Sequence, residues 1–288
     1  MKMQMPPRPS PIAGQWYPGD RRSLVSVVDD YIQGARPVNI QGKVVAVVSP
    51  HAGYLYSGPV AGYAYAALEG MRPEVAAVVS PMHYPYGQPL LTSAHVAYET
   101  PLGSVAIAHE LLDELDSRLN ELLGFGLSRI ANDPEHSLEI QLPFLQRALR
   151  SSFKLLPVMV RDQTSRVGYA LGQSLAHVLK DRDALMVAST DLSHFYPQHI
   201  AHRLDAEVLR CVQELDPQGV LDAELEGKGF ACGRGAVAAV LWAAKELGAN
   251  QVQILKYATS GDVTGDYDRV VGYGAAVVLS APDKTLPA

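Results

Sequence analysis

The chain has 288 residues, of which 48% are hydrophobic and 19% are charged, a balance that predicts a globular protein with a sizeable core rather than a disordered chain. Its net charge of -6 and pI near 5.8 leave no general basic surface, which argues against nucleic acid as a partner. The chain has only two cysteines, no visible signal peptide and no apolar run near the roughly 20 residues that cross a bilayer, so we expect no disulfide framework, no membrane span and a cytoplasmic location.

The first part of the chain predicts an extended arm followed by alternating helices and strands. Closely spaced prolines in residues 1–11 block helix formation, and Asp20 is a candidate N-cap for a helix over residues 23–35. Continuous β-branched runs at residues 43–50 and 75–81 predict strands buried on both faces, joined by a helix of small residues over 60–71. A strand, a helix and a strand within about 30 residues match the size of a right-handed crossover unit.

The alternation continues to the end of the chain. Helices are predicted over residues 109–123, 136–150, 168–180, 201–215 and 236–248, with a kink or break at Pro143 and a short helix opening at Asp216. Strands are predicted over residues 153–160, 184–190, 251–260 and 270–280. No linker or low-complexity tract divides the chain, so we expect one α/β domain over residues 1–288. Its sheet should be largely parallel and flanked by helices, with an antiparallel contribution near the end.

Three predicted strands end near histidines. The run AVVSP occurs at residues 46–50 and again at 77–81, and His51 and His83 follow the two copies. The run at 184–190 is followed by Asp191 and His194. Ligands in open α/β sheets bind outside the carboxyl ends of the strands, so these side chains are expected to converge. Two imidazoles with one anionic ligand suit a divalent transition metal that keeps open coordination positions.

The residues alone leave three candidates for the anionic ligand: Asp191, Glu139 and the thiolate of Cys232. Cys232 lies in GFACGRGAV just before a predicted helix, where the positive end of the helix dipole lowers a thiol pKa. The alternative interpretation of Cys232 is a small buried hydrophobic side chain. A metal-free acyl-transfer pair of Cys232 and His194 is a further hypothesis, but it gives the two strand-end histidines no role.

Two further segments carry candidate pocket residues. HAGYLYSG places Tyr54 and Tyr56 after a strand end, where their hydroxyls would line a pocket. DPEHSLEIQLPF places His136 and Glu139 three residues apart, on one face at the start of a predicted helix. We expect His136 to form part of the pocket wall or to support the metal ligands.

The motifs PHAGYLYSG, SPMHY, EHSLEIQLPF, STDLSHF and CGRGAV occur in this order, with IAGQWYPGD before them and YATSGD after them. Together they resemble the Memo family, whose prokaryotic members are labelled AmmeMemoRadiSam system protein B. The resemblance runs from about residue 10 to residue 280. It implies a fold similar to that of the class III extradiol dioxygenases, which use non-haem Fe(II).

Carried over motif by motif, the resemblance implies that His51, His83 and Cys232 bind the metal, with His194 as general acid/base and Asp191 beside it. It implies a metal-dependent oxidoreductase that uses iron or copper, with zinc as a further option for a site containing a thiolate. Family members are also connected with peptide binding, so the alternative is a non-catalytic module that binds a peptide or small ligand in the same cleft. The family label further implies a functional association with a radical-SAM protein and an AMMECR-type protein.

Overall fold

Four buried strands form the centre of the sheet. The computed structural model describes residues 5–36 and 39–281, so residues 1–4 of the predicted arm lie outside the described part. The β-branched runs fold as predicted into parallel strands in the order β1-β8-β2-β7. Their bounds are β1 (Lys43–Ser49), β2 (Val75–Pro81), β7 (Lys154–Val160) and β8 (Ala184–Ser189). Because these strands are parallel neighbours, their carboxyl ends meet at one edge of the sheet.

Antiparallel strands flank this centre on both sides. β11 (Val270–Ser280) runs against β1 and carries β10 (Gln251–Thr259) on its other side, which confirms the antiparallel contribution predicted near the end. The short β9 (His194–Tyr196) pairs with the start of β11. Beyond β7 lie β3 (Leu90–Ser93), antiparallel, and β6 (Ser128–Ile130), parallel to β3, while β4 (Ala97–Tyr98) and β5 (Val105–Ala106) form a separate pair. These short strands were not predicted, because two to four residues show no measurable periodicity.

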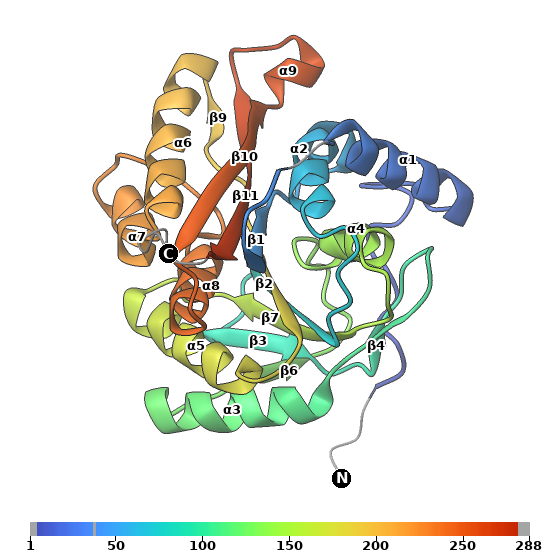
Figure 1. Cartoon of the computed structure of the whole chain (residues 1–288), viewed down its shortest axis with the longest axis vertical. Helices are drawn as coiled ribbons and strands as arrows, with labels where there is room; N and C mark the ends of the chain where they lie inside the picture. The colour runs from blue at the N-terminus through green and yellow to red at the C-terminus, as the bar shows by residue number, and fades with distance from the viewer. Residues whose placement is uncertain (1–4, 37–38, 282–288) are drawn as a thin grey trace, which may run out of the picture.

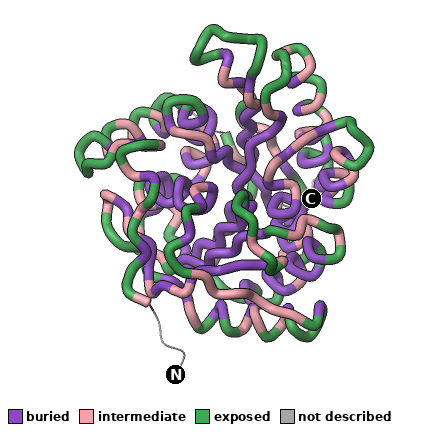
Figure 2. Tube along the Cα trace, turned by 180° about the vertical axis from the view of Figure 1, so that it is seen from behind, coloured by how far each residue is buried: buried purple, intermediate pink, exposed green. Residues whose placement is uncertain are grey.

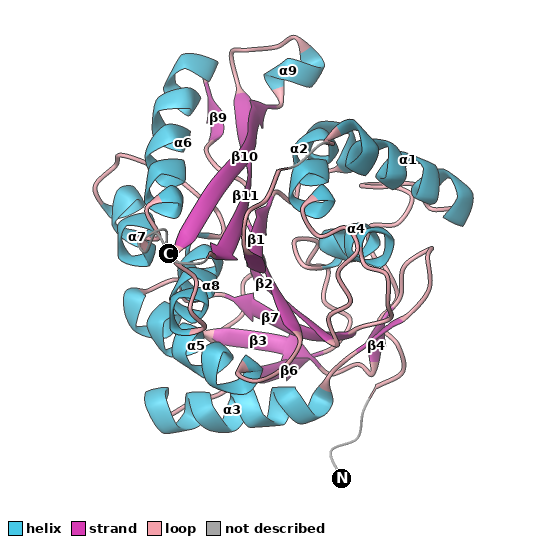
Figure 3. Cartoon of the chain, in the orientation of Figure 1, coloured by secondary structure: helices cyan, strands magenta, loops and turns pink. Residues whose placement is uncertain are grey.

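Helices cover both faces of the sheet, as Figures 1 and 3 show. One face carries α1 (Arg21–Gly34), α2 (Tyr54–Ala66) and α4 (Leu142–Ala148). The other carries α3 (His109–Leu123), α5 (Ser165–Leu179), α6 (Gln198–Gln213), α7 (Pro217–Leu225) and α8 (Arg234–Glu246). The short α9 (Gly261–Thr264) lies between β10 and β11. The buried hydrophobic residues form one continuous cluster around the strands. Figure 2 shows the buried part of the chain, in purple, in the middle of the molecule. The predicted α/β class with a helix-flanked sheet is confirmed.

Two predicted helix starts were wrong. α2 begins at Tyr54, six residues earlier than predicted, and the Ser57 hydroxyl bonds to the Ala52 carbonyl inside its first turn. The helix predicted over residues 136–150 is instead a short 3-10 turn, η1 (Glu139–Gln141), followed by α4 with Pro143 in its first turn. His136 therefore lies in a loop and not on a helix face. The missing amide hydrogen of proline is tolerated only where no helical partner is needed, which favours a helix start at Pro143.

The described part of the N-terminal arm packs against the molecule. Met5 and Arg8 form bridges with His95 and Tyr98, and the Arg8 side chain is buried. Across residues 5–36 and 39–281, no helix has the length and apolar character that a bilayer span requires.

Candidate metal centre

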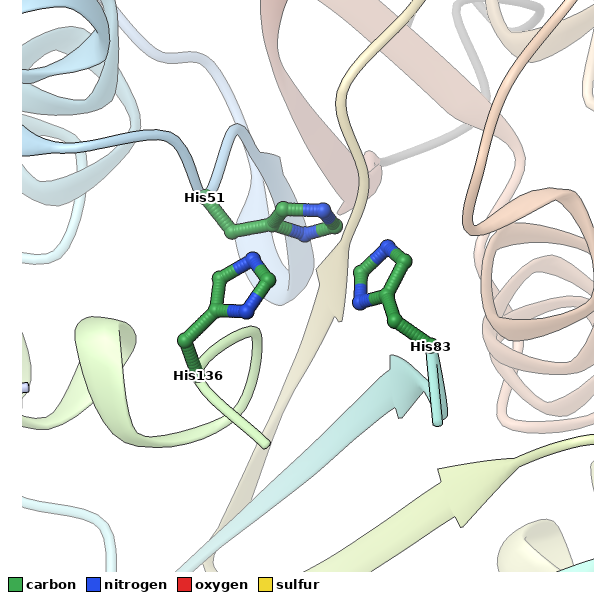
Figure 4. Close-up of side chains that lie close together, drawn as sticks. All are labelled: His51, His83 and His136. Carbon is green, nitrogen blue, oxygen red and sulfur yellow. The ribbon is translucent and has the colours of Figure 1, made fainter. Parts of the chain in front are cut away.

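Three histidines from three separate segments face one another at the carboxyl edge of the sheet (Figure 4). His51 follows β1, His83 follows β2, and His136 lies in the loop before η1. One nitrogen of each ring lies within 4.8 Å of the others, a spacing that fits coordination of a single ion. His51 is buried, His136 is half-buried and His83 is exposed, so the cluster opens toward solvent on one side.

Hydrogen bonds around Ser189 determine which nitrogen of His51 carries the proton. The Ser189 hydroxyl donates its only proton to the Ser137 carbonyl at 2.6 Å and accepts from the Gln141 amide at 2.8 Å. It must therefore accept from Nδ1 of His51, which lies 2.9 Å away. This tautomer leaves Nε2 of His51 unprotonated, which is the form that binds a metal.

The Glu135 carboxylate orients the other two histidines. It accepts hydrogen bonds from Nδ1 and the backbone amide of His83, at 3.0 and 2.6 Å, and from the amides of His136 and Ser137, both at 2.9 Å. Burial pushes the pKa of Glu135 upward, but the hydrogen bond and charge of His83 outweigh it and hold the pKa at about 2. An ionised Glu135 fixes the proton of His83 on Nδ1 and leaves its Nε2 free to bind a cation.

The environment of His51 and His136 keeps these two imidazoles neutral. Burial, followed by repulsion from His136 and His83, lowers the pKa of His51 well below its usual value. Burial also lowers the pKa of His136 to about 4, with His83 adding to the decrease and Glu135 opposing it. The ring of Trp16 packs on His136 with 4.0 Å between centroids and covers that side. Neutral imidazoles held in this way are ready ligands, because no proton must be displaced.

Cys232 lies against the same group of histidines. Its Sγ is 3.1 Å from Nε2 of His51, the nitrogen that the tautomer leaves unprotonated. Burial and the neighbouring Asp191 raise the pKa of the thiol, so it is protonated at neutral pH unless a cation binds. Gly233 allows this approach, because a Cβ at that position would lie 2.3 Å from the Ser189 carbonyl oxygen. Among the described residues, the ligand atoms within 4.8 Å of one another belong to His51, His83 and His136, and Cys232 contacts His51 without being a member of this group.

The two residues predicted for acid/base chemistry lie beside this cluster. The Asp191 carboxylate accepts the backbone amide of His51 at 2.7 Å, and burial raises its pKa to about 7. His194 is half-buried near Phe230, with 5.6 Å between ring centroids. Burial and the charge of His83 lower the pKa of His194, so its imidazole is neutral near pH 7.

The residues predicted to line the pocket have different surroundings. Tyr54 is buried, and its hydroxyl donates to the Ile140 carbonyl at 2.8 Å. Tyr56 is 39% exposed and lines an open cavity at the start of α2. Glu139 is fully buried, and its carboxylate is bound by three side chains: Arg8, Ser10 and Tyr17. It therefore supports the N-terminal segment and does not face an open pocket.

Sequence reasoning missed Glu135, Ser189, Gln141 and Trp16. Glu135 directly precedes His136, and Ser189 is a polar residue at the end of a buried apolar strand, so both had a weak local signal. Their roles depend on contacts between residues about 50 positions apart, such as Glu135 with His83, which no local pattern contains.

Comparisons with known proteins identify the family of the chain. The profile of the Memo family, described as Memo-like protein, matches residues 8–277. A MEMO1 family protein of Nitrosopumilus maritimus is 38% identical over 271 residues, covering 92% of this chain and 96% of the relative. A MEMO1 family protein of Methanopyrus kandleri is 37% identical over 276 residues, with the same coverage.

Among solved structures, an uncharacterized protein from Escherichia coli K12 aligns with a TM-score of 0.49 and 16% identity, covering 82% of this chain and all of that one. The profile match and the two archaeal relatives span nearly the whole chain. The chain therefore belongs to the Memo family.

Proposed function

We propose that the chain is a metal-dependent oxidoreductase whose metal is bound by His51, His83 and His136, with the Cys232 thiol as a further ligand. The observation that carries the proposal is the approach of three ring nitrogens to within 4.8 Å of one another. Two of these rings, those of His51 and His83, have Nε2 unprotonated because Ser189 and Glu135 fix the proton on Nδ1.

The donor set favours a transition metal. Three imidazoles suit iron, copper and zinc, and three protein ligands leave open positions for a substrate. The nearby thiol adds a soft ligand and so increases the preference for copper or zinc over a site with only nitrogen and oxygen donors. When bound, iron or copper would supply a redox-active Lewis acid.

The chain itself supplies acid/base and positioning groups. His194 is neutral and half-buried beside His83, so it would accept a proton from a bound substrate and later return it. Asp191 holds the backbone of His51 and thereby fixes where that ring stands. The raised pKa of Cys232 opposes the metal-free thiol mechanism, because a neutral thiol is a poor nucleophile.

The alternative function is binding of a peptide or small ligand without catalysis. Leu55 and Tyr56 at the start of α2 and Tyr84 after β2 are large apolar side chains exposed near the cluster. Exposed aromatic residues at the rim of a cleft favour ligand binding whether or not a reaction follows.

The decisive experiment is elemental analysis of protein purified without oxygen or chelator. Wild type is compared with His51→Ala, His136→Ala and Cys232→Ser, and with His177→Ala as a control at an exposed histidine. We expect near-stoichiometric metal that is lost in the two cluster variants and retained in the control. Loss in Cys232→Ser with retention in His136→Ala would replace His136 by Cys232 as the third ligand. No metal in wild type, even after anaerobic reconstitution, would overturn the proposal.

Catalysis needs a second measurement. Iron- or copper-loaded protein is assayed for oxygen consumption with a panel of catechols, beside the His194→Ala variant. We expect turnover in wild type and its loss in the variant, with the metal content unchanged. Zinc as the only metal taken up would contradict the oxidoreductase and favour the ligand-binding alternative.

A further inference from the structure

Phe195 occupies a bulge in the short strand β9. Val270 of β11 pairs with Tyr196 and the next residue, Val271, pairs with His194, so Phe195 is an extra residue with no partner in the ladder. Its φ is +64°, in the left-handed region, and its side chain is 62% exposed. β-bulges next to functional sites commonly redirect a side chain, and here the bulge turns an aromatic ring outward beside His194.

This conformation is unfavourable for phenylalanine. The left-handed position of a bulge is usually glycine, because a Cβ collides with the following carbonyl oxygen. The strain is not offset by burial, since most of the ring faces solvent. Strained residues of this kind cluster at ligand-binding sites, where the strain places a group that a ligand uses.

Phe195 forms one wall of an open cavity of about 290 Å³. The cavity is close to the lower end of the roughly 300–1,000 Å³ range of small-molecule sites. Two more aromatic residues line it, Tyr56 from the first turn of α2 and Tyr273 from β11. The remaining lining residues are Ser260, Thr264, Asp266, Arg269 and Val271. Figure 1 shows α9, which lies in the connection between β10 and β11, and β9 at the same end of the molecule.

The cavity contains one cationic side chain. The Arg269 guanidinium carbon lies 5.4 Å from the centroid of the Phe195 ring, and no ion pair of Arg269 occurs among the residues that the structure describes. The one acidic residue in the lining, Asp266, accepts the backbone amide of Asp268 at 3.0 Å, which holds its carboxylate in a local turn. Arg269 would attract an anionic group and Asp266 would repel a second negative charge, so the lining favours a ligand with one negative charge over a dianion.

The cavity also lies next to His194, one of the residues beside the metal centre. The rings of His194 and Phe195 are 5.8 Å apart, and Tyr56 lies in the helix that begins three residues after His51. Burial raises the pKa of Tyr273, and the charge of Asp191 adds to the increase, so Asp191 is within electrostatic reach of the Tyr273 hydroxyl.

We propose that this cavity binds an aromatic carboxylate, with the ring against Phe195, Tyr56 and Tyr273 and the carboxylate on Arg269. The site deepens the proposed function, because it would present such a substrate to the metal centre. Binding itself requires no metal, so the two proposals can fail separately.

The test is titration of the full chain with benzoate, followed by ligand-observed NMR or calorimetry, in the presence of a chelator and again after metal loading. Benzyl alcohol lacks the charge, cyclohexanecarboxylate lacks the aromatic ring and phenyl phosphate carries the higher charge. We expect benzoate to bind on the order of tenfold more tightly than benzyl alcohol, because the alcohol cannot form the charge-assisted hydrogen bond between a carboxylate and Arg269. Weaker binding is expected for the other two probes as well. Equal binding of all four probes would overturn the proposal.

Variants assign the binding to this cavity. Arg269→Gln should weaken benzoate binding, Asp266→Asn should strengthen it, and Arg22→Gln, at an exposed arginine on α1, should leave it unchanged. Phe195→Asn should weaken binding without lowering the urea midpoint of unfolding, because asparagine tolerates a left-handed φ. Benzoate binding that persists unchanged in both Arg269→Gln and Phe195→Asn would place the ligand elsewhere. Benzoate binding by a protein that takes up no metal would leave this site standing and overturn only the metal proposal.

Discussion

At the scale of single residues, the Glu135 side chain connects the two loops that carry His83 and His136. One carboxylate accepts hydrogen bonds from both segments, so the positions of two rings depend on it. Partners of this kind fix the orientation and tautomer of metal-binding histidines.

Replacing Glu135 by glutamine should therefore weaken metal binding. We expect a loss of about 10–100-fold in affinity, because the amide accepts fewer hydrogen bonds and no longer holds the backbone and Nδ1 of His83 with a carboxylate. Competition with a chromophoric chelator for Zn²⁺ or Co²⁺ measures the effect. Glu121→Gln, at an exposed glutamate on α3, is the matched control and should bind as wild type does. Unchanged affinity in Glu135→Gln would remove Glu135 from the metal centre.

Asp205 provides a second prediction for a single residue. It is fully buried on α6, accepts the Ser193 amide at 2.8 Å and the Tyr257 hydroxyl at 2.7 Å, and has His202 nearby. Burial raises its pKa above the ordinary value of 3.8, with the hydrogen bonds opposing the increase. The protonated form is thus favoured in the folded state, and its contribution to stability is lost as pH rises from 3.8 through the raised value.

Asp205→Asn should flatten this part of the pH dependence. The free energy of unfolding of wild type should fall relative to that of the variant as pH increases from acidic to neutral. Urea unfolding of both proteins over that range gives the difference. A constant difference would mean that Asp205 titrates alike in the folded and unfolded chains.

At the scale of elements, the N-terminal segment completes the loop that carries His136. Arg8 is buried and forms ion pairs with Asp133 and Glu139, on either side of that histidine, and it donates to the Glu135 carbonyl at 2.9 Å. An extended arm was predicted from its prolines, but nothing local indicated that it would be buried against residues 125 or more positions away.

Arg8→Ala should destabilise the protein by about 3–5 kcal/mol, because it leaves two buried carboxylates without their cation. Metal affinity should fall as well, since the loop that holds His136 loses its support. Arg36→Ala removes an exposed ion pair with Glu69 and should cost less than about 1 kcal/mol. Urea unfolding and the chelator competition give the two quantities. Equal costs for the two variants would show that the arm contributes little.

The same scale shows where sequence patterns are reliable. The strands β1, β2, β7 and β8 fall within a residue of their predicted starts, because a run of buried β-branched residues has few alternatives. The segment around His136 was placed on a helix because its apolar spacing is helical. In the structure, the Glu135 carboxylate accepts hydrogen bonds from the amides of His136 and Ser137, and the α-helix begins only at Leu142.

At the scale of the whole molecule, the metal would add a further connection among three segments that lie far apart in the sequence. A ligand that binds the folded chain alone stabilises it by mass action. With free Zn²⁺ at 100 times its dissociation constant, we expect about 2.7 kcal/mol of added stability. Thermal unfolding with and without metal measures this, and a variant with all three histidines replaced by alanine should show no increase. An equal increase in that variant would locate the metal outside the cluster.

The sequence by itself determined the α/β class, the central strands and the fact that histidines stand at their carboxyl ends. These features follow from side-chain periodicity and from the rule that parallel strands end at one edge, both of which are local. The motif resemblance to the Memo family was likewise a property of the sequence, and the relatives confirmed it.

Only the tertiary structure decided that His136 joins His51 and His83 and that Glu135 and Ser189 fix the protons of His83 and His51. It also decided that a bulge turns Phe195 toward Arg269. The physical reason is that hydrogen bonds and metal sites depend on distances of a few ångströms between groups far apart in the chain. Periodicity predicts which face of a helix or strand a residue occupies, but not which distant residue it contacts.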